Sequence, residues 1–557
     1  MTENLLGSGR PSRSKWITTG PLIGVLLLGM GLRLCGLDSK SLWQDEIFTA
    51  AIASPENGAL EVVTIPLYNT ALPAPPLYFL ITHFFLFLGD NDFLLRFPAL
   101  AFGLLGLAAT YALGVRLFGE VEGIIGALLL AVAPFHVRYS QDARFYTLLV
   151  LLSLLSVYFL YQGMSSGKRK WFAGFVLCSV LNLYNHLFAF MVLAAQVIFV
   201  AGLWAAQALV RLRRSRSSAV EGAGAVPILD RSAALVFLVS MIIIALAYTP
   251  MAPHLLRGLS GAKGVGDAGG GAAFGLSFPA LALDSWGLGS GWRILLLAVP
   301  FALGVIASAR GQCKQLWLAG CWILVPFGAL LVVPAGHGFR PRYVLFMLPL
   351  YLILAARGLT AASGFVRQRS SVPTPRSGAV VLAVLVGAVK LLSVPALWAY
   401  YEEDRADWRS VAALVAARIS PGDVIVSPGP FPQIVMPRYE ESLEGASFLI
   451  GGSEVFLSAD EERQGGVWFV GPAREKMQAI DLELAQAEEF VFKVVFEVDD
   501  GSSARGRALK IAPVMYDDLW VLYVREGLQP EDVAELYHED LELMAAWGHI
   551  VRQGQPG

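Results

Sequence analysis

An acidic pair, Asp45 and Glu46, lies in a short polar segment after the first long apolar run of this 557-residue chain. Trp43 precedes the pair, and Ile47 and Phe48 follow it. Ionisable groups that apolar neighbours hold at membrane depth are costly, and they are functional candidates by default. One such carboxylate could remove a proton from a hydroxyl group as a general base. A helix cap or a solvated loop would also explain an acidic pair, and that alternative stays open.

A second set of residues combines arginine, histidine and tyrosine in the polar segments between later apolar runs. It comprises Arg138, Asp142, Arg144, Tyr146, His186, Arg340, Arg342 and Tyr343. A guanidinium group matches the geometry of phosphate oxygen atoms. Arginines on the outer side of a membrane run against the usual excess of basic residues inside, so an anionic phosphate ligand is their simplest explanation. The alternatives are an ion pair between Asp142 and Arg144 and a structural role for His186.

One carboxylate and a phosphate-binding set of arginines suit the transfer of a sugar from a lipid-linked phosphate donor. The leaving group is itself a stable phosphate anion, so the reaction needs no strong general acid. A base would deprotonate the acceptor hydroxyl group, and the cations would stabilise the charge that develops on the leaving phosphate. Such a single displacement inverts the anomeric carbon. This chemistry requires no metal and no other cofactor, although it leaves a role for a divalent ion open.

Long apolar segments must hold these residues in place. Hydrophobic residues make up 55% of the chain and charged residues 15%, and the mean hydropathy is +0.58. Soluble domains carry about 25% charged residues. Apolar runs near the length of a membrane-crossing helix recur along the chain. A net charge of −2 without a basic tract argues against nucleic acid as a partner, and the four cysteines follow no disulfide or metal-ligand spacing.

The distribution of lysine and arginine predicts the topology, because basic loops stay on the cytoplasmic side. If all basic clusters face the cytoplasm, an even number of spans separates each neighbouring pair. This condition predicts about 11 transmembrane helices with a cytoplasmic N-terminus, provided that residues 75–88 are interfacial. That segment is short for a membrane span. The first four predicted spans cover residues 16–35, 94–117, 123–138 and 145–162.

The predicted fold is therefore an all-α polytopic membrane bundle over residues 1–399, with interfacial helices in a first external loop at 36–93. From about residue 400 the composition changes, and short β-rich runs alternate with helical stretches. The predicted strands are 423–427, 467–470, 490–498 and 519–524, and the predicted helices include 408–418 and 474–486. This alternation predicts an extracytoplasmic α/β domain over residues 400–557. The expected location is the inner (plasma) membrane of a bacterium, with this domain periplasmic or extracellular.

The order of several motifs resembles that of the GT-C glycosyltransferases of the family 39 type, the bacterial relatives of protein O-mannosyltransferases and of the lipid A aminoarabinose transferase. The motifs are SLWQDE at 41–46, PPLY at 75–78, LRFP at 95–98, YSQDARFY at 139–146, RY at 342–343 with Pro349, and DWR at 407–409. The resemblance covers residues 16–410. Each motif alone is weak, but unrelated membrane proteins would rarely match all of them in this order.

The resemblance implies that Asp45 is the catalytic base and that Glu46 supports it. It implies a polyprenyl-phosphate monosaccharide as donor, with undecaprenyl or decaprenyl as the lipid, and an extracytoplasmic protein, lipid or glycan as acceptor. The implied substrate-binding residues are Trp43, Tyr78, Arg96, Arg138, Asp142, Arg144, Tyr146, His186, Arg340, Arg342 and Tyr343. Relatives carry His or Lys before the two prolines, where this chain has Ala74. Two other functions stay open: a transporter or flippase of polyprenyl-linked substrates, and a non-catalytic scaffold.

Overall fold

The computed structural model describes the chain in two compact units. The described residues run from Arg13 to Val524, except for 69–73, 217–230, 255, 257–276, 287–290, 333–339, 370–374, 403–407, 418, 428–430, 451–466, 473–513 and 517–518. The first unit contains residues up to Leu37 and Ile52–Glu402. The second unit contains Asp38–Ala51 together with the chain from Glu403 onward.

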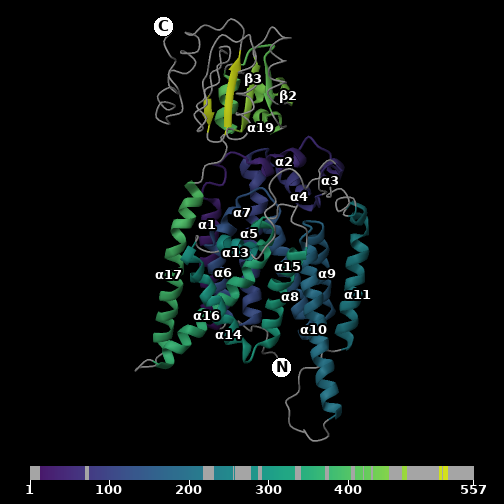
Figure 1. The fold of residues 1–557 in the computed structure, drawn as a ribbon, viewed down its shortest axis with the longest axis vertical. Helices are drawn as coiled ribbons and strands as arrows, with labels where there is room; N and C mark the ends of the chain where they lie inside the picture. Colours follow the sequence, from purple (N-terminus) through teal and green to yellow (C-terminus); the bar gives the residue numbers. More distant parts are fainter. Residues whose placement is uncertain are drawn as a thin grey trace, which may run out of the picture. The chain divides into compact units, whose positions relative to one another are not determined.

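The first unit is a bundle of α-helices (Figure 1). Its helices are α1 (Arg13–Leu34), α3 (Ala59–Tyr68), α4 (Leu77–Leu86), α5 (Asp92–Leu117), α6 (Glu120–Ala131), α7 (Pro134–Ser140), α8 (Tyr146–Ser166), α9 (Arg169–Leu183), α10 (Ala189–Arg216), α11 (Arg231–Tyr248), α13 (Ser277–Trp286), α14 (Leu295–Ala309), α15 (Cys313–Val332), α16 (Leu348–Arg369) and α17 (Pro375–Glu402). Three 3₁₀ segments join them: η1 (Thr249–Met251), η3 (Gly291–Ile294) and η5 (Pro341–Met347).

The predicted polytopic bundle is confirmed. Within the described residues, seven helices are long and apolar enough to cross a membrane, and the bent pair α6–α7 gives up to eight. Helices also lie at the three remaining predicted spans. The apolar part of α1 is Thr19–Leu34, and α9 and α14 have 15 residues each. The segment predicted to be interfacial contains α4, which has 10 residues. At 1.5 Å per residue α4 extends about 15 Å, half the thickness of a hydrocarbon core.

The predicted span at residues 123–138 consists of two helices in the structure. Helix α6 ends at Ala131, and α7 begins at Pro134 with a bend of 65° between their axes. Proline has no N–H group for the helix ladder, and its ring clashes with the carbonyl group four residues earlier. Helix α7 ends at Ser140, so the bend sets the direction in which the chain enters the polar residues 141–146.

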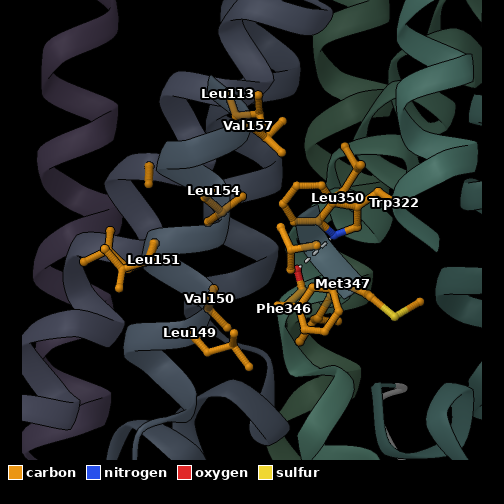
Figure 2. Close-up of a cluster of buried hydrophobic side chains, with 14 of the residues drawn as sticks. Leu113, Leu149, Val150, Leu151, Leu154, Val157, Trp322, Phe346, Met347 and Leu350 are labelled. Carbon is orange, nitrogen blue, oxygen red and sulfur yellow. Dashed lines mark hydrogen bonds between the residues drawn. The ribbon is translucent and has the colours of Figure 1, made fainter. Parts of the chain in front are cut away.

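The core of the bundle forms where α8 packs against other spans. Figure 2 shows Leu149, Val150, Leu154 and Val157 of α8 beside Leu113, Trp322, Phe346, Met347 and Leu350. The indole Nε1 of Trp322 donates a hydrogen bond of 3.1 Å to the carbonyl oxygen of Phe346. Elsewhere Gly304 of α14 and Gly358 of α16 let the two backbones approach so closely that a Cβ atom at either position would clash. Small residues at such crossings are typical of membrane helices.

The second unit contains a five-stranded sheet, which confirms the predicted α/β domain. Its elements are α2 (Gln44–Ala53, up to Ala51 in this unit), α18 (Trp408–Ala416), β1 (Val424–Ser427), α19 (Phe431–Tyr439), η6 (Glu441–Leu443), β2 (Ser447–Ile450), β3 (Val467–Pro472), β4 (Val514–Tyr516) and β5 (Leu519–Val524). The strand order is β2-β1-β3-β5-β4. Strand β1 is parallel to both neighbours, and β5 is antiparallel to both of its own. The predicted elements at 474–486 and 490–498 lie outside the described residues.

Candidate active site

The acidic pair lies in the first turn of α2, in the second unit. Glu46 is fully buried, whereas Asp45 is half-buried. The backbone N–H of Trp43 donates to Glu46 Oε2 at 3.4 Å. A glutamate that reaches back to the residue before its helix satisfies a backbone donor that the helix itself leaves unpaired. Glu46 therefore supports the start of α2, and Asp45 is the more accessible carboxylate of the pair.

Distant parts of the second unit hold the segment before α2 in place. The backbone N–H of Leu42 donates to the hydroxyl oxygen of Tyr439 at 3.0 Å. The guanidinium group of Arg409 donates to the carbonyl oxygen of Ser39 at 3.4 Å and lies over the ring of Tyr439. Phe48 packs edge-on against Phe431. The motifs SLWQDE and DWR are therefore neighbours in the fold, although more than 360 residues separate Ser39 from Arg409.

In the first unit, aromatic residues from α4, α8, η5 and the turn between α9 and α10 converge on the end of the bundle that carries the motif at 139–146. We call this end the site face. The rings of Tyr146, His186 and Tyr343 lie 6.1 to 6.3 Å apart. Phe145 lies 4.7 Å from His186. Tyr78 is fully buried and packs edge-on against Phe145 at 6.3 Å. The structure thus brings four of the predicted site residues into one aromatic cluster.

Two of the predicted arginines lie over rings of this cluster. The guanidinium carbon of Arg144 is 4.4 Å from the ring of Phe145. That of Arg342 is 5.9 Å from the ring of Tyr146 and 5.6 Å from that of Tyr343. Stacking on an aromatic face orients a guanidinium group. Both side chains are half-buried, so they combine a fixed position with access from outside.

Asp142, Arg138 and Arg342 each interact electrostatically with Tyr139, and Arg342 also forms a side-chain hydrogen bond with it. Asp142 is buried, and its carbonyl oxygen accepts a hydrogen bond from the backbone N–H of Arg144 at 2.6 Å. One carboxylate and two guanidinium groups therefore share Tyr139 as a neighbour.

His186 lies in the turn between α9 and α10. Its Nδ1 accepts a hydrogen bond of 3.0 Å from the backbone N–H of Phe188, so the neutral ring carries its proton on Nε2. Burial, with a smaller contribution from the positive charge of Arg144, lowers the pKa of His186 to about 3. The imidazole is therefore neutral at physiological pH. It can donate a hydrogen bond from Nε2, but it is a poor proton acceptor.

A buried network behind the site face holds the motif residues in register. The hydroxyl group of Tyr400 donates to Gln141 Oε1 at 2.6 Å, and Arg138 lies 5.9 Å from the ring of Tyr400. Gln141 Nε2 donates to the carbonyl oxygens of Arg33 and Cys35. The turn that carries Asp142 and Arg144 is thus tied to the ends of both α1 and α17.

Arg33 is the centre of this network and is fully buried. Its Nε donates to Ser140 Oγ at 3.1 Å, and its NH2 group lies 2.7 Å from His136 Nδ1. Its remaining N–H groups point at the carbonyl oxygens of Gly29, Leu130 and Ala131. Sequence reasoning did not select Arg33, Gln141 or Tyr400 as site residues. The sequence contained one signal for this network, because Arg33 is a charged residue inside the first apolar run.

Two predicted substrate-binding residues, Arg340 and Arg96, have other surroundings than this cluster, and so does Ala74. Arg340 is exposed at the start of η5. Arg96 is buried, and it donates to the carbonyl oxygen of Leu37 at 2.8 Å. Ala74 packs against the apolar cluster of Ile52, Val62 and Phe79, so its surroundings are apolar in this chain. Among the described residues, no group of three or more His, Cys, Asp or Glu side chains could hold a metal ion.

Comparison with known proteins adds a family and a fold. Residues 73–215 match the model of the family dolichyl-phosphate-mannose-protein mannosyltransferase. No curated protein matches the sequence. The fold is similar to that of ArnT from Cupriavidus metallidurans in the apo state, with a TM-score of 0.59 and 13% identity over 93% of this chain and 99% of that chain. ArnT bound to undecaprenyl phosphate gives a TM-score of 0.56 and 14% identity over 91% and 99%.

The archaeal oligosaccharyltransferase AglB from Archaeoglobus fulgidus, in complex with an inhibitory peptide and a dolichol-phosphate, is also similar in fold. Its TM-score is 0.51 at 11% identity, and the match covers 88% of this chain and 74% of that chain. At such identities structural likeness shows the fold, whereas the family match covers the segment that carries Arg96, Arg138, Asp142, Arg144 and His186. Taken together, the family match over residues 73–215 and the shared fold support a GT-C glycosyltransferase of the protein mannosyltransferase and ArnT type.

Proposed function

We propose that this glycosyltransferase moves a monosaccharide from a polyprenyl-phosphate donor to a hydroxyl group of an extracytoplasmic acceptor, with inversion at the anomeric carbon. The observation that carries the proposal is the pair of half-buried arginines, Arg144 and Arg342, stacked on the aromatic cluster of the site face. Two cations fixed near one another at the end of membrane spans suit a phosphate group whose lipid chain remains in the bilayer.

Related folds support a lipid phosphate as the donor. ArnT has been crystallised with undecaprenyl phosphate, and the structure of AglB contains an inhibitory peptide and a dolichol-phosphate. Both lipids are polyprenyl phosphates without a sugar, which is the product that a donor leaves after transfer. Arg144 and Arg342 would bind the phosphate oxygens, and the neutral His186 would donate a hydrogen bond from Nε2.

In the proposed reaction, the carboxylate of Asp45 removes the proton from the acceptor hydroxyl group. The acceptor oxygen attacks the anomeric carbon of the sugar, and the bond between that carbon and the phosphate oxygen breaks. The electron pair leaves with the polyprenyl phosphate, whose new charge the two guanidinium groups stabilise. Glu46 positions Asp45 by holding the first turn of α2.

The test uses membranes that contain the full chain and receive a synthetic polyprenyl-phosphate sugar. Asp45→Asn should fold normally and abolish transfer, because the amide cannot accept the proton. Asp38→Asn is the matched control, since Asp38 is an exposed aspartate seven residues earlier in the same segment. Wild-type turnover by the Asp45→Asn variant would refute the assignment of the base.

The proposal also requires the site face to be extracytoplasmic, in the inner membrane of a bacterium. The chain contains its own probes, because Cys35 and Cys313 are exposed and Cys178 and Cys321 are buried. Cys35 follows α1 at the site face, and Cys313 begins α15 at the opposite face. A membrane-impermeant maleimide should label Cys35 in intact cells and Cys313 only after permeabilisation, with Cys35→Ser and Cys313→Ser as controls. The reverse pattern would invert the proposed orientation.

A further inference from the structure

Two cations converge on one tyrosine ring at the end of the bundle opposite the site face. Arg116 is in the last turn of α5, Lys314 is in the first turn of α15, and Tyr161 is near the end of α8. The guanidinium carbon of Arg116 lies 5.6 Å from the ring centroid of Tyr161, and Lys314 Nζ lies 4.5 Å from it. Lys314 Nζ also donates to Ser165 Oγ at 3.1 Å. We call these four residues the opposite-face cluster.

This cluster has no acidic member among the described residues, and neither cation has a carboxylate within ion-pair distance there. The contrast with Arg357 on α16 is direct. Arg357 donates to Glu122 Oε1 at 3.2 Å, and Glu122 lies at the start of α6, close in sequence to Arg116. The fold thus supplies a carboxylate to one arginine of this end but holds Arg116 and Lys314 near each other without one. Like charges held together favour the binding of an anion.

The shape of the cluster fits a phosphate group. Tyr161 is buried and forms the floor, Arg116 and Ser165 are exposed, and Lys314 is half-buried. The two cations and the hydroxyl group come from three different spans, so their arrangement depends on the folded bundle. Tyr146 and Tyr161 lie on the same helix, 15 residues or about 22 Å apart. The cluster is therefore separate from the candidate active site.

Its position favours a membrane lipid as the source of that phosphate. The cluster lies where three apolar spans end, which is the depth of lipid headgroups. Trp317 and Leu324, seven residues apart on α15, are 42% and 69% exposed. They continue from Lys314 as an apolar surface on one side of that helix, against which an acyl chain can lie.

We propose that Arg116, Lys314 and Ser165 bind the phosphodiester group of an anionic phospholipid at this face of the membrane. Tyr161 holds both cations in position through its ring. The site is independent of the proposed transfer reaction, so its failure would leave that reaction untouched.

The experiment compares lipid retention by the purified full chain in native mass spectrometry, with phosphatidylglycerol and phosphatidylcholine supplied at equal concentrations. Wild type should retain phosphatidylglycerol in preference. The double variant Arg116→Gln/Lys314→Gln should lose about tenfold in the ratio of bound to free protein. Lys168→Gln/Arg169→Gln removes two exposed charges from the same face and should keep the preference. Lys314→Arg should retain most of it.

Three results would overturn the proposal. Equal retention of the two lipids by wild type would exclude a headgroup site. If the Lys168→Gln/Arg169→Gln control lost as much phosphatidylglycerol retention as the Arg116→Gln/Lys314→Gln variant, general surface charge would explain the preference. The third result concerns stability against heat. If inorganic phosphate raised the thermal midpoint of wild type as much as phosphatidylglycerol vesicles did, the cluster would be a site for a free anion. Thermal midpoints measured without lipid identify any variant that has failed to fold, and Arg116→Gln alone then serves as the milder test.

Discussion

Arg33 and Arg357 are both held within the helical bundle of the first unit, but by different partners. Arg33 is fully buried near the site face, and neutral acceptors, three of them carbonyl oxygens, surround its guanidinium group. Arg357 lies towards the opposite face with its side chain 26% exposed, and it pairs with the carboxylate of Glu122. The positive charge of Arg33 is therefore solvated but not neutralised, whereas that of Arg357 is cancelled locally. The two ends of the bundle therefore hold an arginine in different ways, by hydrogen bonds to neutral acceptors near the site face and by an ion pair towards the opposite face.

Removal of Arg33 should have the largest effect on stability. Arg33→Met would remove the guanidinium donors to Ser140 Oγ, His136 Nδ1 and three carbonyl oxygens, at a cost of about 3 kcal/mol or more. The thermal midpoint in detergent should fall accordingly, and transfer should fall with it because Ser140, directly before Gln141 in the motif, loses the hydrogen bond from Arg33 Nε. Arg33→Lys should recover part of the midpoint. A midpoint equal to wild type in Arg33→Met would show that the network contributes nothing to stability.

Loss of a site arginine should reduce turnover without a similar loss of stability. One charge-assisted contact to phosphate is worth about 1.5–3 kcal/mol, so Arg144→Gln and Arg342→Gln should each lower kcat/KM about tenfold or more. The exposed Arg169 provides the control, because Arg169→Gln removes the same charge at the opposite face. If Asp142→Asn/Arg144→Gln regained wild-type activity, Arg144 would be a structural partner of Asp142.

The ion pair at the opposite end should affect stability alone. Arg357→Gln leaves the buried Glu122 with Thr360 as its remaining donor at 2.8 Å and should lower stability by about 1–2 kcal/mol. The double variant Glu122→Gln/Arg357→Gln should recover part of that loss. A double-mutant cycle on midpoints measures the coupling. A large fall in turnover at an unchanged midpoint would contradict the division between the two ends.

The last prediction concerns the pH dependence of stability, to which His186 contributes. The pKa of His186 is lowered to about 3 in the fold, against an ordinary value of 6.5. The unfolded chain therefore binds an extra proton below pH 6.5, and the fold loses stability as the pH falls from there towards 3. Midpoints between pH 4 and pH 7 should change less in His186→Gln than in wild type. An equal slope in both would mean that His186 is not held neutral.

The sequence predicts the parts of this fold that depend on length and apolarity. Long runs such as α8 can be identified as spans without knowledge of their partners, and Pro134 is a local signal for the bend between α6 and α7. The network behind the site was beyond prediction, since it joins Arg33 to Ser140 and Gln141 to Tyr400. Such pairings depend on which helices pack together, and periodicity along one helix contains no information about that.

The site residues divide in the same way. Motif order selected Arg144, Tyr146, His186 and Tyr343, and the structure brings them together. The order of the motifs could not reveal that Glu46 is buried as a helix cap while Asp45 is accessible. That difference arises from how the first turn of α2 folds.

The last turn of α17 limits how relatives of this enzyme can be recombined. Tyr400 donates to Gln141, and the hydroxyl group of the next residue, Tyr401, donates to the carbonyl oxygen of Leu32. A chimaera that exchanges the C-terminal domain at residue 399 would replace both tyrosines and remove two supports of the motif before any new domain had been tested. A junction placed after Glu402 keeps them. Loss of activity in the first chimaera alone would therefore report on the membrane unit and not on the specificity of the grafted domain.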